Sequence, residues 1–332
     1  MNCETLITAL CRSRSAGHIN ETVNIAADYL KSFAEVKVNE NYIKAVIDKN
    51  SDRTIMLEAH IDQVGFIVTA VFDDGFLKVA PVGSIDARFL PSTEVIFFGK
   101  EKVSGVFTSI PPHLKKGDTV PDFDVCLVDT GKADIKDVVS PGDIGFFASE
   151  PTPLLNNCIT ACGLDNRAGC AAVLLAAEKI ASEKSGANVI ILLTMGEELG
   201  LRGAKVAAFD SKADMALAVD VSFGNFEGIS SDKTSTVGSG PMIGISPILS
   251  KNIYSTLTKL AESYNIPYTK EVMGGRTGTN ADIISISGSG IPSALVSIPL
   301  RNMHTPCEVV SLADIENSAQ LIYLFAKEGF EC

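Results

Sequence analysis

Five residues of metal-binding type each end an apolar stretch of this 332-residue sequence. The stretches cover residues 54–60, 158–165, 189–198, 214–220 and 294–304, and the residues that end them are His60, Asp165, Glu198, Asp220 and His304. Short apolar runs separated by helical stretches are typical of buried strands in a largely parallel sheet. Because ligands bind at the carboxyl ends of such strands, we expect the five side chains to meet at one edge of the sheet.

This set of side chains suits two divalent cations, since imidazole and carboxylate groups are common ligands of zinc and related metals. Three carboxylates and two neutral imidazoles would leave two dications with one surplus positive charge, which a shared hydroxide would neutralise. Each residue also has an ordinary interpretation. His60 could be a core histidine, Asp165 a helix N-cap and Glu198 part of a solvated loop. The coincidence of five strand ends favours the metal centre.

Two further acids, Asp62 and Glu197, lie beside these candidates. Asp62 follows His60 by two residues, so its carboxylate could accept the second ring N–H of a metal-bound imidazole. Neighbouring side chains of an extended segment point to different sides, so one of Glu197 and Glu198 could bind metal while the other moves a proton. Spacing alone does not assign these two roles.

Composition restricts the class of protein. A hydrophobic content of 46% and a charged content of 20% indicate a globular chain, and its length favours two domains. The net charge of −12 argues against nucleic acid and anionic membrane surfaces as partners. No apolar run reaches the roughly 18 residues of a membrane span, and the N-terminus lacks a basic region typical of signal peptides. We therefore expect a cytoplasmic protein whose eight cysteines, which form no CxxC pair, are reduced.

The texture of the sequence changes twice along the chain. Residues 1–63 contain two expected helices, a hairpin turning at residues 39–41 and the strand that ends at His60. Short alternating runs with Gly, Pro and Asp turns fill residues 64–157. Strands and helices then alternate up to a last helix that Ser311 is expected to cap through its hydroxyl. We predict a mixed, largely parallel α/β sheet sandwiched by helices, formed by residues 1–63 and 158–332, with an inserted small all-β domain at residues 64–157.

The motifs around these residues resemble the M42 family of dinuclear metallo-aminopeptidases. They are Ala59-His-Ile-Asp62, Gly163-Leu-Asp-Asn-Arg167, Glu197-Glu-Leu-Gly-Leu-Arg-Gly-Ala204, Val219-Asp220 and Met303-His-Thr-Pro306. The resemblance implies a zinc-peptidase-like fold in which Asp165, Glu198 and His304 hold one metal. His60, Asp165 and Asp220 would hold the second, and Glu197 would be the general base that activates a water held between the metals.

The resemblance also implies cofactors, substrates and assembly. The two metals would be zinc or cobalt, with manganese as a further candidate, and the substrates would be short peptides that lose their N-terminal residue. The β-rich insert would mediate dimerisation, and dimers would build a tetrahedral dodecamer.

Substrate contacts are expected from the Gly-rich segment 274–280. Arg276, next to Gly275, could offer its guanidinium to an acidic side chain or a peptide carboxylate, or it could pair with a surface acid. The family more usually has Asp where Asn280 stands, which leaves a charge-dependent role of this loop open. His113 could face the cleft of a neighbouring subunit or lie in a plain surface turn, and His18 is expected to be structural or exposed.

Three other functions remain open at this point. A metal-dependent amidase or deacylase would use the same metals on a different amide. An endoglucanase is less favoured, because the chain has no Trp and 7% aromatic residues, and adjacent Glu197 and Glu198 are poorly placed to flank a glycosidic bond. A catalytically silent binding protein is disfavoured by the complete set of expected ligands and base.

Overall fold

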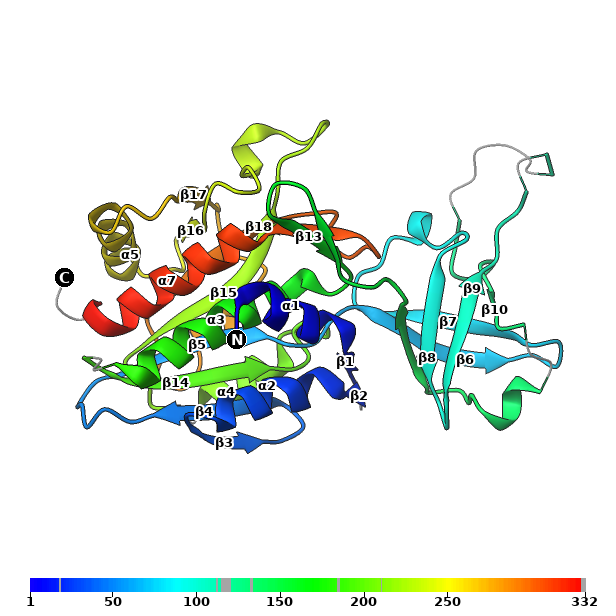
Figure 1. Cartoon of the computed structure of the whole chain (residues 1–332), viewed down its shortest axis with the longest axis horizontal. Coiled ribbons are helices and arrows are strands. Elements are labelled where there is room, and N and C mark those ends of the chain that lie inside the picture. Colours follow the sequence, from blue (N-terminus) through cyan, green and yellow to red (C-terminus); the bar gives the residue numbers. More distant parts are fainter. Residues whose placement is uncertain are drawn as a thin grey trace.

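The computed structural model describes the chain except for residues 18, 112, 115–120, 132, 133, 184, 185, 210 and 330–332. His18 lies outside the described residues. Figure 1 shows two parts: a large sheet with helices packed on it, and a closed β-barrel beside one end of that sheet. This arrangement confirms the predicted fold class, an α/β sheet with a small all-β insert.

The large sheet has a parallel centre and antiparallel edges. Its strand order is β12-β13-β19-β18-β15-β5-β14-β4-β3; β16 also pairs with β18, and β17 pairs with β16. Parallel pairing links β14 (Asn188–Thr194), β5 (Thr54–His60), β15 (Met215–Phe223) and β18 (Ser293–Arg301). The remaining strands are β3 (Glu35–Val38), β4 (Tyr42–Ile47), β12 (Thr152–Leu154), β13 (Cys158–Ala161), β16 (Met242–Ile245), β17 (Thr269–Val272) and β19 (Glu308–Ser311).

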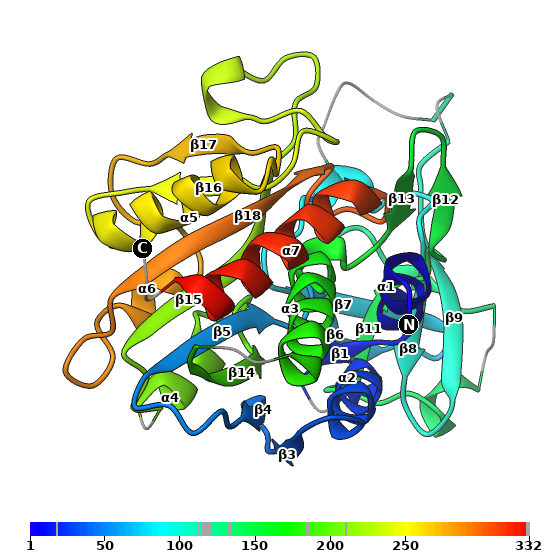
Figure 2. The ribbon, with the colours of Figure 1, turned by 60° about the vertical axis from the view of Figure 1, so that its left-hand side comes forward.

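Helices cover both faces of this sheet, which explains why its central strands are apolar throughout. Alternate residues of β14 enter two different core clusters, Val189 and Ile191 on one face and Ile190 and Leu192 on the other. The first cluster includes residues of α1 (Cys3–Arg12), α2 (Glu21–Lys31), α3 (Leu164–Ser182), α5 (Lys251–Ser263) and α7 (Leu312–Glu328). The second includes residues of α4 (Arg202–Phe209) and α6 (Ala281–Ile284). Figure 2 shows α3 and α7 side by side over the sheet.

Among the described helices, none combines the length and apolar character needed to cross a bilayer.

The barrel has its own core. Its strands are β6 (Gly65–Val71), β7 (Phe76–Val82), β8 (Glu94–Phe98), β9 (Lys102–Phe107), β10 (Val128–Asp129) and β11 (Ile144–Phe147), and pairing of β10 with β9 closes it. Inside, the ring of Phe66 lies 5.1 Å from that of Phe107 and 5.0 Å from that of Phe147, centroid to centroid. Although β12 falls within residues 64–157, it pairs with β13 in the large sheet.

Short elements complete the fold: β1 (Ser15–Ala16), β2 (Ile19–Asn20) and the 3₁₀ turns η1 (Ala87–Phe89), η2 (Ile135–Asp137) and η3 (Ser231–Lys233).

Three local predictions were wrong. The Ser311 hydroxyl makes no capping hydrogen bond to α7. Asp220 does not end its strand, because β15 continues its pairing with β18 as far as Phe223. Asp165 follows β13, which is an antiparallel strand near the sheet edge and not part of the parallel centre. In each case pairing or packing with a distant segment outweighs the local sequence signal.

Candidate metal centre

The five predicted ligands meet in one place. Asp165, Glu198 and His304 form one group that could hold a metal ion, and His60, Asp165 and Asp220 form another. Asp165 belongs to both groups, and its two carboxylate oxygens face different imidazoles. Oδ1 lies 3.2 Å from Nε2 of His60, and Oδ2 lies 3.2 Å from Nε2 of His304.

The other carboxylate of each group also lies close to the imidazole of that group. Oδ1 of Asp220 lies 3.6 Å from Nε2 of His60, and Oε1 of Glu198 lies 3.1 Å from Nε2 of His304. Asp220 and His60 reach each other from β15 and β5, which are neighbours in the sheet. Glu198 comes from the loop that follows β14, on the other side of β5. His304 follows β18, so the parallel centre of the sheet supplies four of the five candidate ligands, and Asp165 is the exception.

A backbone turn brings Asp165 to the same point. Gly163, at the start of α3, has a φ of 74°, in the left-handed region that glycine adopts without strain. A Cβ atom at this residue would lie 2.7 Å from Oε1 of Gln63, so a larger residue would also collide. The Asp165–Asn166 peptide bond is cis, and the regular helix starts after it.

His304 has an unusual backbone conformation and is held by two contacts. Its backbone has a φ of 61°, which is unusual for a residue with a side chain and is typical of functional sites. The Glu308 carboxylate accepts its backbone N–H at 2.7 Å and the Asp165 N–H at 3.2 Å. Nδ1 of the ring lies 2.7 Å from the carbonyl oxygen of Ser84, which follows the barrel strand β7. This contact directs Nε2 toward the acids and makes the barrel part of the site.

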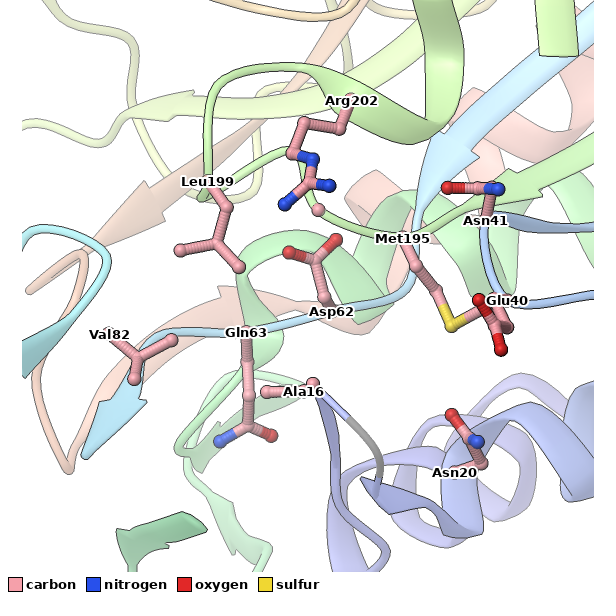
Figure 3. Close-up of a pocket in the computed structure, with 12 residues that line it drawn as sticks. Ala16, Asn20, Glu40, Asn41, Asp62, Gln63, Val82, Met195, Leu199 and Arg202 are labelled. Carbon is pink, nitrogen blue, oxygen red and sulfur yellow. The ribbon is translucent and has the colours of Figure 1, made fainter. Parts of the chain in front are cut away.

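The Asp62 carboxylate does not make the contact that the sequence predicted. Nδ1 of His60 lies 3.2 Å from the Asp62 carbonyl oxygen but 3.6 Å from the carboxylate, so the carbonyl is the nearer acceptor. The Asp62 carboxylate instead accepts the N–H groups of Glu197 and Glu198, at 3.2 and 3.3 Å. Figure 3 shows that carboxylate directed toward the loop that carries Leu199 and leads to Arg202 at the start of α4. Asp62 therefore orients the backbone of the two glutamates.

The electrostatics of the cluster fit bound cations. Burial alone would lower the pKa of both histidines, but the adjacent carboxylates outweigh it. They raise the pKa of His60 well above its usual value and that of His304 to about 11. Burial raises the pKa of Glu197 to about 8. Three carboxylates facing two imidazoles hold surplus negative charge, and this mixed nitrogen and oxygen donor set fits divalent metal ions.

Sequence reasoning missed three acids around the centre: Glu58 and Glu308, which are buried, and Glu271, which is half-buried. Glu58 accepts hydrogen bonds from the Thr194 hydroxyl at 2.6 Å and the Asn280 amide at 2.7 Å, and burial raises its pKa to about 7. Asn280 is thus a donor to a neighbouring carboxylate. For Glu58 the available signal was an acid inside the apolar strand β5, because a buried carboxylate requires compensating partners.

A cleft of about 590 Å³ opens beside the centre. Its lining includes His60, Asp165, Glu197, Glu198, Asp220 and His304, and also Arg276 and Glu271. Gly275 and His113 are not among the described residues that line it. The Gly275 carbonyl accepts a hydrogen bond from the Ser246 hydroxyl, and His113 is exposed.

The fold and this donor set describe an α/β protein with a candidate centre for divalent metal ions. Residues 41–321 match the family model described as M42 glutamyl aminopeptidase. A lysyl aminopeptidase from Pyrococcus furiosus is 29% identical over 316 residues, covering 92% of this chain and 90% of that protein. The structure of an aminopeptidase from the archaeon Desulfurococcus kamchatkensis is 30% identical, with a TM-score of 0.91 and coverage of 98% of this chain and 94% of that one.

The TET1 peptidase of Pyrococcus horikoshii, which can assemble into a tetrahedron or a large octahedral shell, is also similar. It is 26% identical, with a TM-score of 0.87 and coverage of 98% of this chain and all of that one (100%). This chain belongs to the M42 glutamyl aminopeptidase family and is an aminopeptidase, which confirms the resemblance of its motifs. The comparisons do not favour the amidase and endoglucanase alternatives.

A substitution of Glu308 tests whether its hydrogen bonds to the backbone of Asp165 and His304 orient these candidate metal ligands. Glu308→Ala should weaken binding of divalent metal by about tenfold to a hundredfold, because removing partners that orient metal ligands has effects of this size. Titration calorimetry with zinc measures the change. Glu316→Ala, which removes an exposed acid of α7, is the matched control. Equal zinc affinity of the two variants and the parent would contradict the assignment.

Proposed function

We propose that this aminopeptidase holds two divalent metal ions and removes N-terminal residues from short peptides, with Glu197 as the general base. The observation that carries the proposal is the pair of donor groups that share Asp165. A shared carboxylate with one oxygen toward each imidazole suits two adjacent cations better than one.

The ligands divide between two positions in this proposal. Asp165, Glu198 and His304 would hold one ion, and His60, Asp165 and Asp220 the other. Zinc and cobalt suit this donor set, and manganese is a further candidate. When bound, such ions would lower the pKa of a water molecule and polarise the carbonyl group of the substrate.

Glu197 would carry the proton. Its side chain lines the cleft without belonging to either donor group, and Asp62 orients its backbone. The Glu197 carboxylate would take a proton from water as the oxygen attacks the carbonyl carbon. It would then deliver that proton to the leaving amine nitrogen. A carboxylate held beside the attacked carbonyl can make both transfers.

Glu197→Gln tests the base. The variant should keep the metal content of the parent but lose about 10²- to 10⁴-fold in kcat on aminoacyl anilides, because the amide cannot accept the proton. Metal analysis and steady-state kinetics measure the two properties. Glu227→Gln, at an exposed loop residue, should match the parent in both. Parent-like turnover of the Glu197 variant would remove it from the mechanism.

Asp165→Asn tests the sharing of one carboxylate. Asp165 belongs to both donor groups, so its loss should weaken metal binding at both positions. Asp220 belongs to one group, so Asp220→Asn should weaken metal binding at one position only. Each variant is stripped with chelator, reloaded with zinc or cobalt, and analysed for metal per chain. A parent-like metal content in Asp165→Asn would contradict the shared site. Peptidase activity that survives in the stripped parent would contradict metal dependence altogether.

The substrate residues remain proposals. We propose that Arg276 forms part of the cleft wall that meets the peptide, which its position in the cleft lining supports. Gly275, its neighbour, does not line the cleft and is not proposed as a contact. His113 is exposed and could reach the cleft of a neighbouring subunit.

We further propose that the chain forms a homo-oligomer in which the insert at residues 64–157 mediates dimerisation and dimers build a dodecamer. Support comes from exposed apolar side chains on this insert: Phe72, Phe89, Val106, Ile110, Leu114, Val125, Leu154 and Leu155. We also infer a cytoplasmic location, which agrees with the seven described cysteines all being free thiols.

Val125→Asp tests the assembly, because a charge placed in a subunit contact is costly to bury. Val125 is 69% exposed in the single chain. The assembled particle of the variant should have a smaller mass than that of the parent, as measured by light scattering or sedimentation. Val272→Asp, at a residue of β17 that is 73% exposed, is the control outside the insert. A monomeric parent would refute the proposal.

A further inference from the structure

Glu271 is an acid of the cleft that the proposed mechanism does not use. It lies on β17, and its side chain lines the cleft together with the metal-site residues. The hydroxyls of Ser222 and Ser297, on the adjacent strands β15 and β18, each donate a hydrogen bond to one of its carboxylate oxygens. The Ser297 contact is 2.7 Å long. The carboxylate is thus fixed in one orientation.

This carboxylate has no cationic partner among the described residues. Burial is the main influence on it and raises its pKa, and the nearby charge that acts on it is another acid, Asp220. Two neutral hydroxyls compensate the loss of water only in part, because buried charges are normally paired with an opposite charge. The site is therefore prepared for a cation that arrives from the cleft.

Other charged residues of the cleft do not fill this role. Asp282 also lines the cleft, but its carboxylate already accepts the N–H groups of Thr277 and Gly278 and the Thr277 hydroxyl. Arg276 is exposed and does not appear among the groups that act on Glu271. Glu271 is consequently the acid of the cleft wall that is both fixed in place and available.

We propose that Glu271 binds a cationic ammonium group of the N-terminal residue of the substrate. The inference rests on the proposed aminopeptidase site, which provides the reason for a peptide N-terminus in this cleft. Two ammonium groups have this chemistry: the α-ammonium of any substrate and the side-chain ammonium of an N-terminal lysine. Either would form a charge-assisted hydrogen bond with the carboxylate.

Glu271→Gln separates the two sources. Gln keeps the shape and can still bond to Ser222 and Ser297, so the variant removes the charge alone. The anilides of lysine and norleucine are matched in chain length and differ in the side-chain charge. Loss of one charge-assisted hydrogen bond should lower kcat/KM by about tenfold to a hundredfold, mainly through KM. A loss for both anilides assigns the α-ammonium, and a loss for the lysine anilide alone assigns the side chain.

Binding provides a readout that does not depend on turnover. Calorimetric titration of free lysine and norleucine into the metal-loaded parent and Glu271→Gln should show the same pattern of lost affinity. Unchanged kinetics and unchanged binding for both compounds would overturn the proposal. If the parent binds these amino acids but cleaves neither anilide, the proposed function fails, while the calorimetric comparison still decides the role of Glu271.

Two controls exclude a structural effect. Glu35→Gln, at an exposed residue of β3, changes the net charge equally and should leave both substrates unaffected. Thermal unfolding and metal content should be the same in Glu271→Gln and the parent. A loss of metal together with activity would assign Glu271 to support of the metal centre and refute its role in binding the substrate.

Discussion

The crowding of carboxylates around Asp165 is the constraint on which the site depends. Asp165 stands between two imidazoles, and two further acids approach the same imidazoles from outside. Such a cluster is costly to bury, because like charges repel and water is excluded. Divalent cations remove this cost, so the stability of the site and its chemistry have the same origin.

A second set of contacts holds the cluster in place. Glu308 ties the backbone of Asp165 to that of His304, and Asp62 ties the backbone of Glu197 to that of Glu198. Glu58 performs a similar task below His60 by joining β5 to β14 and to the start of α6. Each of these buried acids accepts hydrogen bonds from a segment that carries a functional residue or lies beside one.

The barrel has a direct part in this arrangement. The carbonyl oxygen of Ser84, just after β7, accepts a hydrogen bond from Nδ1 of His304. This contact determines which ring nitrogen faces the acids. The insert and the catalytic sheet are therefore coupled through one hydrogen bond at the metal centre. A change in how the barrel sits against the sheet would move His304, a candidate metal ligand.

The sequence by itself determined the types of the candidate metal ligands, the apolar strands that precede or carry them and the β-rich segment, because alternation and strand ends are local patterns. Only the tertiary structure decided that Asp220 lies within its strand, that Asp165 follows an antiparallel strand, and that Asp62 serves the glutamate backbone. It also decided the partners of Glu58, Glu271 and Glu308. The physical reason is that these contacts join residues far apart in the chain, and no local pattern records which distant donors a buried carboxylate will meet.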